Sequence, residues 1–327
     1  MSSGDYLFGK ATCASIRHFM PEVPIAVLLD GDVDTTALER TYQNIQVIRK
    51  SDIDHPWLRE NSFGWGITKM LAFWYSPFDH FLYLDSDTVV WGDLKESLPW
   101  SQFDYITDIP SNASASAVEH VQTWFFEPDT LEREFPQFPW RNYVDQYACT
   151  GTFTARKNLF DVDEYRELLE FNDKHPQTFK FGEMGLLNFM IFRKHHESAI
   201  NLGFEDFQSI FPELEKSELS KRFSFSESLP LLNSGDVQVL HMPDQKPLVE
   251  NENCYSLPMT YFRLKYLEDA EGLTGEAAMQ KLQIEDKQFI KKRKSKKNTA
   301  RFRKVQRLLS LHPGEWRYFY QNYLVRA

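Results

Sequence analysis

The hydrophobic pattern of the first hundred residues alternates between two kinds of segment. Short apolar runs that end in polar turn residues are typical of buried strands, and they lie at 24–32, 45–49 and 80–94. Segments with apolar residues at helical spacing lie at 8–19, 35–43 and 66–76. Strands that alternate with helices predict an α/β fold of Rossmann-like type, in which helices flank both faces of a mostly parallel sheet.

Beyond about residue 110 the pattern loosens. Residues 111–142 are rich in Ser, Pro and aromatic side chains, which predicts a long loop or a cover over a site. Regular elements then return, with strands expected at 147–155 and 237–242 and helices at 162–173 and 182–194. The last part is helical and charged, so we expect two domains, residues 1–260 and a helical C-terminal extension over 261–327.

Length and composition exclude several classes of protein. At 327 residues, 42% apolar and 26% charged, the chain is neither disordered nor fibrous and is long enough to bury a sizeable core. It shows neither the roughly 18–20 apolar residues of a membrane span nor a secretory signal. Three widely spaced cysteines make neither a disulfide framework nor a zinc cluster. We expect a soluble, cytoplasmic protein.

The net charge of −10 conceals an asymmetry. Residues 287–307 contain eleven Lys or Arg and no acidic residue, and 37 less 11 leaves 26 basic against 47 acidic residues elsewhere, a charge of −21. Such a segment suits a solvated linker, an anionic lipid surface or a nucleic acid. The aromatic residues of 308–325 favour peripheral attachment to the inner face of a membrane through 287–325, whereas the acidic remainder is unsuited to nucleic acid.

Asp85 and Asp87 carry the sharpest chemical signal. They flank Ser86 just past a buried apolar strand, the edge at which open α/β sheets bind ligands. Two ionised carboxylates this close need a compensating cation, and hard oxygen ligands suit Mn²⁺ or Mg²⁺ alongside substrate phosphates. A solvated turn is the alternative interpretation of this short motif.

The surrounding sequence strengthens the metal-site interpretation. Thr68-Lys69, on a predicted helix, precedes the strand that ends in the acidic turn. Four more segments follow a set order along the chain: GDYLFGKATCASIR (4–17), YACTGTF (147–153), FGEMGLLNF (181–189) and LHMPDQKP (240–247). With these motifs, the sequence over residues 4–247 resembles the family 8 glycosyltransferases of the GT-A fold, the group of glycogenin and the bacterial galactosyltransferases.

The resemblance implies a metal-dependent enzyme that moves a hexose from a nucleotide diphosphate sugar to an acceptor, with retention at the anomeric carbon. A UDP-sugar is the first choice of donor, and the acceptor is a glycan, a lipid or a protein. By the same resemblance, Asp85, Asp87 and His241 would hold Mn²⁺ or Mg²⁺, and Glu183 would stabilise the transition state. Donor contacts would come from Tyr6, Lys69 and Lys246.

The sequence departs from the family pattern at several positions. Cys149 replaces an asparagine, and Glu183-Met184 replaces an Asp-Gln pair. The spacing from His241 to Lys246 is five residues, one shorter than in the family. These changes bear more on the stereochemical outcome than on sugar transfer itself.

The N-terminus also departs from the pattern. The resemblance places GDYLFG just after the first strand, where about five apolar residues normally begin such a sheet. Only Met1-Ser2-Ser3 precede it, so we expect a first strand that is truncated or supplied in another way.

Two other functions stay open at this point. The first is a phosphatase of the haloacid dehalogenase type, in which Asp85 would be the nucleophile and Asp87 a general acid/base. The second is a non-catalytic nucleotide-sugar-binding protein, and the departures at Cys149 and Met184 would support it.

Overall fold

The computed structural model describes residues 1–64, 66–110, 117–211, 213–233 and 238–309. The chain divides into two compact units, Met1–Ala278 and Met279–Ala327. The first contains every strand described below, together with α11 (Leu257–Glu271). The second begins within α12 (Gly275–Leu309) and contains the rest of that helix. The domain boundary expected near residue 260 remains a prediction. Among the described helices, none combines the length and the apolar character that crossing a membrane requires.

The alternation of strands and helices in the first hundred residues is confirmed. The elements are α1 (Tyr6–Phe19), β1 (Ile25–Leu28), α2 (Thr36–Thr41), β2 (Ile45–Ile48), η1 (Lys50–Asp52), α3 (Pro56–Asn61), η2 (Ile67–Leu71), α4 (Ala72–Tyr75), β3 (His80–Leu84), β4 (Thr88–Trp91) and α5 (Leu94–Ser97). The single helix expected over 66–76 is a 3-10 turn, η2, followed by one α-helical turn, α4. Its start is set by Gly66, which has a φ of 76°.

The second half of the first unit contains more regular structure than the sequence pattern predicts. Its elements are β5 (Tyr105–Asp108), α6 (Ala117–Trp124), α7 (Pro128–Glu134), η3 (Trp140–Tyr143), β6 (Thr152–Arg156), α8 (Val162–Lys174), α9 (Glu183–His196), β7 (Leu202–Glu205), β8 (Gln208–Ile210), α10 (Lys216–Arg222), β9 (Phe223–Ser226), β10 (Leu229–Leu232) and β11 (Gln238–His241). The cover expected over 111–142 therefore folds into α6, α7 and η3 from residue 117 onward. Residues 111–116 lie outside the described part.

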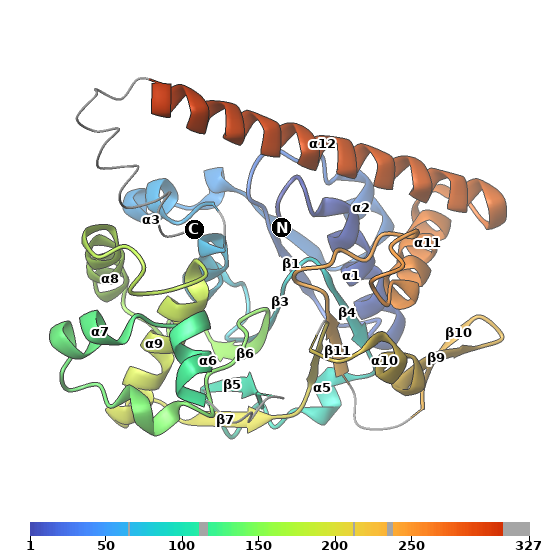
Figure 1. Ribbon diagram of the computed structural model, residues 1–327. Helices are drawn as coiled ribbons and strands as arrows, with labels where there is room; N and C mark the ends of the chain where they lie inside the picture. The colour runs from blue at the N-terminus through green and yellow to red at the C-terminus, as the bar shows by residue number, and fades with distance from the viewer. Residues whose placement is uncertain (65, 111–116, 212, 234–237, 310–327) are drawn as a thin grey trace. The chain divides into compact units, whose positions relative to one another are not determined.

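The strands form an α/β arrangement with mixed pairing (Figure 1). β1 and β2 pair alone, β3-β6-β5-β7 form a four-stranded sheet, β4-β11-β8 a three-stranded one, and β9-β10 a hairpin. Parallel pairing, as strand–helix alternation favours, holds for β1–β2, β5–β7 and β8–β11. β6 instead runs antiparallel to β3 and β5, because it returns from the long 109–151 connection rather than through a single crossover helix.

Pairing register brings a remote strand to the acidic turn. β3 ends at Leu84 and β4 begins at Thr88, so the turn 85–87 connects the four-stranded sheet to the three-stranded one. β11 lies antiparallel to β4 with His241 opposite Thr88. The last residue of β11 therefore comes to rest beside the turn, although 154 positions separate His241 from Asp87.

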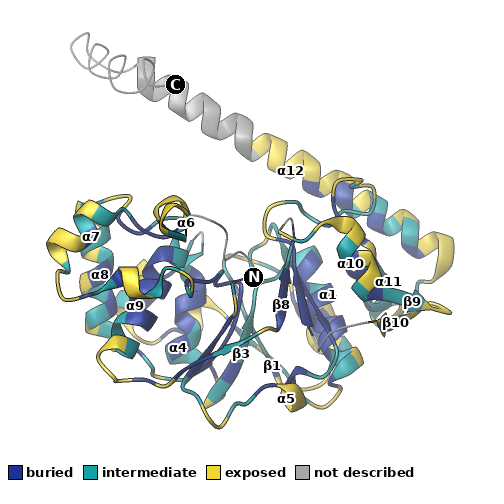
Figure 2. Cartoon of the chain, turned by 60° about the horizontal axis from the view of Figure 1, so that its bottom comes forward, coloured by how far each residue is buried: buried dark blue, intermediate teal, exposed yellow. Residues whose placement is uncertain are grey.

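A hydrophobic core lies against the four-stranded sheet, in which β5 and β6 are the most buried strands and the edge strand β3 is only partly buried (Figure 2). At its centre Phe153 of β6 stacks on Tyr83 of β3 at 5.0 Å and on Tyr105 of β5 at 5.1 Å between ring centroids. The Tyr83 hydroxyl also donates to Asp85 Oδ1 at 3.0 Å. Core packing thus positions one of the two acidic side chains directly.

Candidate functional site

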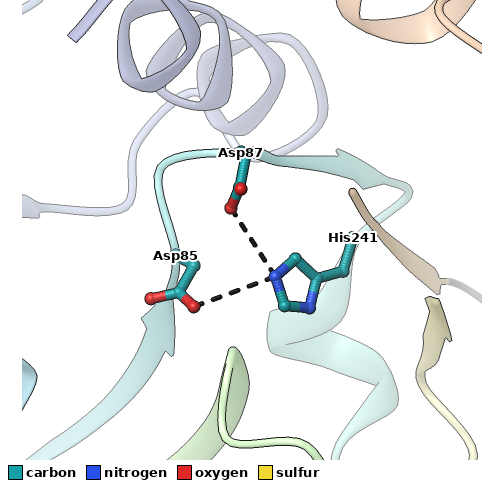
Figure 3. A group of neighbouring side chains, drawn as sticks. All are labelled: Asp85, Asp87 and His241. Atoms are coloured by element: carbon teal, nitrogen blue, oxygen red, sulfur yellow. Dashed lines mark ion pairs between the residues drawn. The ribbon is translucent and has the colours of Figure 1, made fainter. Parts of the chain in front are cut away.

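Three side chains from two strand ends converge at the turn (Figure 3). His241 Nε2 lies 3.5 Å from Asp87 Oδ1 and 3.8 Å from Asp85 Oδ2. One ligand atom from each of the three residues falls within 4.8 Å of the other two. The side chains of Asp87 and His241 are buried, whereas that of Asp85 is 30% exposed, so the group is reached from solvent on the Asp85 side.

Hydroxyl groups hold the acidic turn in place. Thr12, on the buried face of α1, donates to the carbonyl oxygens of Ser86 at 3.0 Å and Thr88 at 2.7 Å. Thr88 in turn donates to the carbonyl of Asp85 at 2.7 Å. These bonds satisfy backbone carbonyl oxygens of the turn and of the start of β4, and so hold in place the backbone that carries both carboxylates.

The surroundings of His241 would suit a metal ligand. Its Nδ1 donates to Gln208 Oε1 at 2.9 Å, which leaves Nε2 as the atom directed at the two carboxylates. Nε2 is buried and has no hydrogen-bond partner within the described structure. The imidazole also lies against Gly151, where an added Cβ would be 2.0 Å from His241 Cε1. The space for the ring exists because residue 151 has no side chain.

The charges in the group compensate one another in the structure. Burial alone would lower the pKa of His241, but Cys149 and Asp87 raise that pKa to about 10. Burial alone would raise the pKa of Asp87, but His241 and Lys246 hold it below its usual range. A proton on the imidazole therefore occupies the place of a cation among the carboxylates, and a bound metal ion would displace it.

Lys69 is a second positive charge in this cluster. Its Nζ lies 2.7 Å from Glu183 Oε1 and 3.4 Å from Asp85 Oδ2, and it donates to the Thr150 carbonyl at 2.9 Å. Burial alone would lower the pKa of Lys69, but the two carboxylates raise it well above its usual value. The ammonium group is therefore charged and bridges the acidic turn to α9.

Glu183 begins α9 and is held closely on two sides. Thr150 Oγ1 donates to Glu183 Oε1 at 3.0 Å. Gly66 faces the other oxygen, because a Cβ at residue 66 would lie 1.7 Å from Glu183 Oε2. Glycine at this position also permits the positive φ with which η2 begins. The glutamate is consequently packed into the site rather than exposed at a helix end.

Lys246 contacts the acidic group, whereas Tyr6 lies at the start of α1. Lys246 Nζ forms an ion pair with Asp87 Oδ2 and donates to the Pro243 carbonyl at 3.2 Å. Tyr6 opens α1 with Lys10 Nζ 5.7 Å from its ring centroid, and burial raises the pKa of its hydroxyl above the usual range. The donor contact expected of Tyr6, stacking on the base of the nucleotide, stays a prediction.

The donor set suits a small divalent cation. Three carboxylates and two ammonium groups give a charge of −1 when the imidazole is neutral, and a divalent ion would change it to +1. Carboxylate oxygens and an imidazole nitrogen are ligands that Mn²⁺ accepts, and a positive site attracts a diphosphate. The unpartnered His241 Nε2, aimed between two carboxylates, is the observation that fits such an ion.

Several contacts of the site are not indicated by the sequence. Gln208 and Gly66 join the site only through strand register and helix packing. Thr150 and Gly151 lie within the motif YACTGTF (147–153), but the motif alone indicates no contact with Glu183 or His241. Tyr83 is the exception, because residues two apart on a strand point to the same side, which aligns it with Asp85. Asn188 of α9 bonds both the amide and the carbonyl of Ala148, at 3.2 and 2.9 Å, and so fixes the backbone beside Cys149.

The chain has the fold of the GT-A glycosyltransferases. The galactosyltransferase LgtC, in complex with donor and acceptor sugar analogues, is similar at a TM-score of 0.52 and 15% identity over 84% of this chain and 95% of that one. WbbM, a bifunctional glycosyltransferase, gives 0.53 and 13% over 80% and 48%. GlyE of Streptococcus pneumoniae TIGR4 gives 0.51 and 13% over 83% and 61%. At these identities the likeness concerns the fold, and membership of family 8 stays a prediction.

Sequence comparisons add nothing to this likeness. No protein-family model matches the chain, and no curated protein matches it.

Asp108 supports the site from behind Gln208. Its Oδ1 accepts from the backbone N–H groups of Phe207 at 3.2 Å and Gln208 at 3.0 Å. These bonds fix the start of β8, from which Gln208 reaches His241. Burial raises the pKa of Asp108 to about 7, because the residue is 4% exposed and its two amide donors only partly compensate.

The raised pKa predicts a pH-dependent effect of Asp108→Asn. In the unfolded chain the carboxyl ionises near pH 4, so the wild type loses stability as pH rises from about 4 to 7. Asparagine keeps the accepting oxygen without the charge. The variant should gain on the order of 2 kcal/mol over the wild type at pH 8 and much less at pH 5 in urea unfolding. Equal differences at both pH values would contradict this assignment, and the exposed Asp163→Asn serves as control.

Proposed function

We propose that the protein is a metal-dependent glycosyltransferase that moves a hexose from a nucleotide diphosphate sugar to an acceptor. The observation that carries the proposal is the convergence of Asp85, Asp87 and His241 at a strand end within a GT-A fold. Lys69 and Glu183 lie next to them and supply a charged wall to the same site.

Asp85, Asp87 and His241 would hold the ion through one atom each. When bound, Mn²⁺ or Mg²⁺ would neutralise charge on the diphosphate as it leaves. Gln208 keeps His241 Nε2 directed inward, and the partly exposed Asp85 faces the side from which donor and ion enter. Asp87 and His241 would therefore be the buried, fixed ligands, and Asp85 would be the accessible ligand at the opening of the site.

Lys246 and Lys69 would serve the donor in different ways. Lys246 is paired with Asp87 and is 15% exposed, so its ammonium group can turn from the carboxylate to a phosphate oxygen when a cation takes its place. Lys69 is buried at 4% exposure and stays with Glu183 and Asp85. We assign diphosphate binding to Lys246 and electrostatic positioning beside the donor to Lys69.

Glu183 is our candidate for stabilising positive charge on the sugar at the transition state. A carboxylate fixed in advance by Lys69, Thr150 and a tight approach from Gly66 needs no reorganisation during the reaction. Retention at the anomeric carbon remains part of the proposal. Met184 offers no amide oxygen at the neighbouring position, so a retaining reaction would depend on Glu183 and the half-buried Cys149.

A UDP-sugar is our first choice of donor, and the acceptor is a glycan, a lipid or a protein. Support comes from the solved galactosyltransferase LgtC, whose structure contains donor and acceptor sugar analogues. A lipid or protein acceptor is equally compatible with the described residues.

Metal binding should follow the donor set. Isothermal titration of the wild type with Mn²⁺ should give one site. Gln208→Ala should weaken it by about 10–100-fold, as is typical of groups that orient a ligand, and Asp87→Asn should weaken it further. Asp163→Asn, an exposed acid outside the site, should bind like the wild type. Undiminished binding in Asp87→Asn would exclude this site.

Catalysis should depend on the same residues. With Mn²⁺, the wild type should release UDP from a UDP-hexose, and Asp85→Asn should reduce the rate by about 100-fold or more. The same protein is tested with a phosphomonoester. Cleavage of the monoester through Asp85 would establish the phosphatase alternative, and failure with both substrates despite metal-dependent donor binding would establish a non-catalytic binding protein.

Glu183→Gln should separate binding from chemistry. The amide keeps the size of the side chain and an acceptor for Lys69 but removes the negative charge. We expect Mn²⁺ affinity within about threefold of the wild type and a sugar-transfer rate lower by about 10²–10³. An unchanged transfer rate would remove Glu183 from the transition-state role. Circular dichroism and thermal unfolding of the variant check that the fold is intact.

We also propose that the basic segment 287–307 attaches the protein to an anionic membrane surface. In the described part this segment belongs to α12, and the side chains at 291–294 include four consecutive cations. The aromatic residues within 308–325, which favour the same attachment, lie outside the described residues. A basic stretch without an acidic residue gains up to about 1 kcal/mol per cation near such a surface.

Vesicle sedimentation tests this attachment. The wild type should bind phosphatidylserine-containing vesicles, release at high salt and ignore pure phosphatidylcholine. Replacing Lys291, Lys292, Arg293 and Lys294 with Glu should reduce binding at least about tenfold. Binding that is equal for the variant and the wild type would refute the proposal.

A further inference from the structure

An apolar cavity of about 610 Å³ lies between two strands that do not pair with each other. β1 and β3 both line it, α1 contributes Cys13 and Ile16, and Leu71 and Ala72 line it from η2 and α4. The acidic turn borders it through Ser86. This cavity, which we call the strand slot, has no role in the proposed chemistry.

β1 presents unused backbone groups to the strand slot. The amide of Ile25 donates to Asn44 and that of Leu29 to Ile48, so the odd-numbered residues of the strand face β2. In a parallel pair the alternate residues point their N–H and C=O groups to the opposite edge. The backbone of Ala26 and Leu28 is therefore directed into the slot.

β3 presents a matching edge. The backbone amide of Asp85 donates to the Gly151 carbonyl and that of Lys157 to the Asp79 carbonyl, so residues 79, 81, 83 and 85 pair with β6 and the segments that flank it. The backbone groups of the even residues His80, Leu82 and Leu84 point away from β6. Within the described residues, no strand pairs with this edge.

Met1 and Ser2 already occupy one end of the slot in strand geometry. Ser2 forms a parallel bridge with Asp30. The Met1 nitrogen donates to the Leu28 carbonyl at 2.5 Å, and the Asp30 amide donates to the Met1 carbonyl at 2.9 Å. These are the two bonds of a parallel ladder with Met1 opposite Leu29. The amino group takes the place of a peptide N–H, and burial there lowers its pKa.

We propose that the strand slot is a binding site for an extended apolar peptide, which runs parallel to β1 in the register of Met1 and Ser2. From its N-terminal to its C-terminal end, the residues of the peptide lie opposite Ile25, Ala26, Val27 and Leu28 in turn, so that its last residue comes directly before the position of Met1. Its alternate amides bond β1 on one edge and β3 on the other, as in β-strand addition. The apolar lining accepts its side chains on both faces, against α1 and against α4.

Occupation of the slot changes the sheet. The two-stranded β1–β2 pair and the four-stranded sheet become one continuous sheet, because a single strand bonds both. Buried backbone N–H and C=O groups are unfavourable without a hydrogen-bond partner, and the added strand supplies partners to those of β1 and β3. The strand that carries Asp85 at its end loses its exposed edge, which makes the site more rigid.

A peptide delivered at high local concentration tests the proposal. About five Val and Ile residues are fused directly before Met1 of the full chain, and the control carries Pro at the residue opposite Val27. Proline removes the amide that donates to the Ala26 carbonyl. We expect a higher Tm for the Val-Ile extension, and amide exchange at Ala26, Leu28, Leu82 and Leu84 slowed at least about tenfold relative to the proline control.

Two outcomes would overturn the proposal. Equal exchange at these four amides in both extended chains would mean that no ladder forms. A rise in Tm of the unextended chain with dodecanoate, together with no protection by the Val-Ile extension, would assign the cavity to an apolar small molecule. The unextended chain with free acetylated peptide provides a second measurement should an extended chain fold poorly, and its slowed exchange at the same amides would support the proposal.

Discussion

The site depends on bringing three carboxylates together where water is mostly excluded. Asp85, Asp87 and Glu183 lie close enough that their repulsion must be compensated, and the structure does so with Lys69, Lys246 and His241. Placing such charges out of water is unfavourable unless each is paired and hydrogen-bonded. The surrounding hydroxyl, amide and carbonyl contacts follow from this requirement.

This electrostatic arrangement links the fold to the proposed reaction. The cations that stabilise the cluster are of two kinds, one buried and fixed, Lys69, and one able to leave its partner, Lys246. In the structure the lysines form ion pairs with the carboxylates. A divalent ion would bind the same carboxylates, and a diphosphate would bind the same type of cation. Donor binding would therefore replace existing ion pairs rather than create an unbalanced charge.

The sequence predicted the parts of this site that obey local rules. Asp85 and Asp87 follow a buried strand, and His241 ends another, so the strand-end rule and the motif order were sufficient to bring them together. The contacts of Gln208, Gly66 and Gly151 were not predictable, although Gly151 lies in one of the motifs, since they depend on the register of β8 and β11 and on the approach of α9 to η2. The structure differs from the expected helix at 66–76 and from the expected loop at 111–142. Gly66 begins a 3-10 turn there, and aromatic residues of 117–142 are buried in the core; both depend on tertiary packing, which local sequence rules do not capture.

The acidic turn joins two sheets, and this has a mechanical consequence. Asp85 is attached to the end of β3, whereas His241 belongs to the sheet of β4, β11 and β8. A cation bound by both Asp85 and His241 would link the two sheets at the seam, the line along which they meet. Its binding energy would resist sliding of one sheet past the other, so the affinity of the cation and the resistance of the seam to shear would rise and fall together.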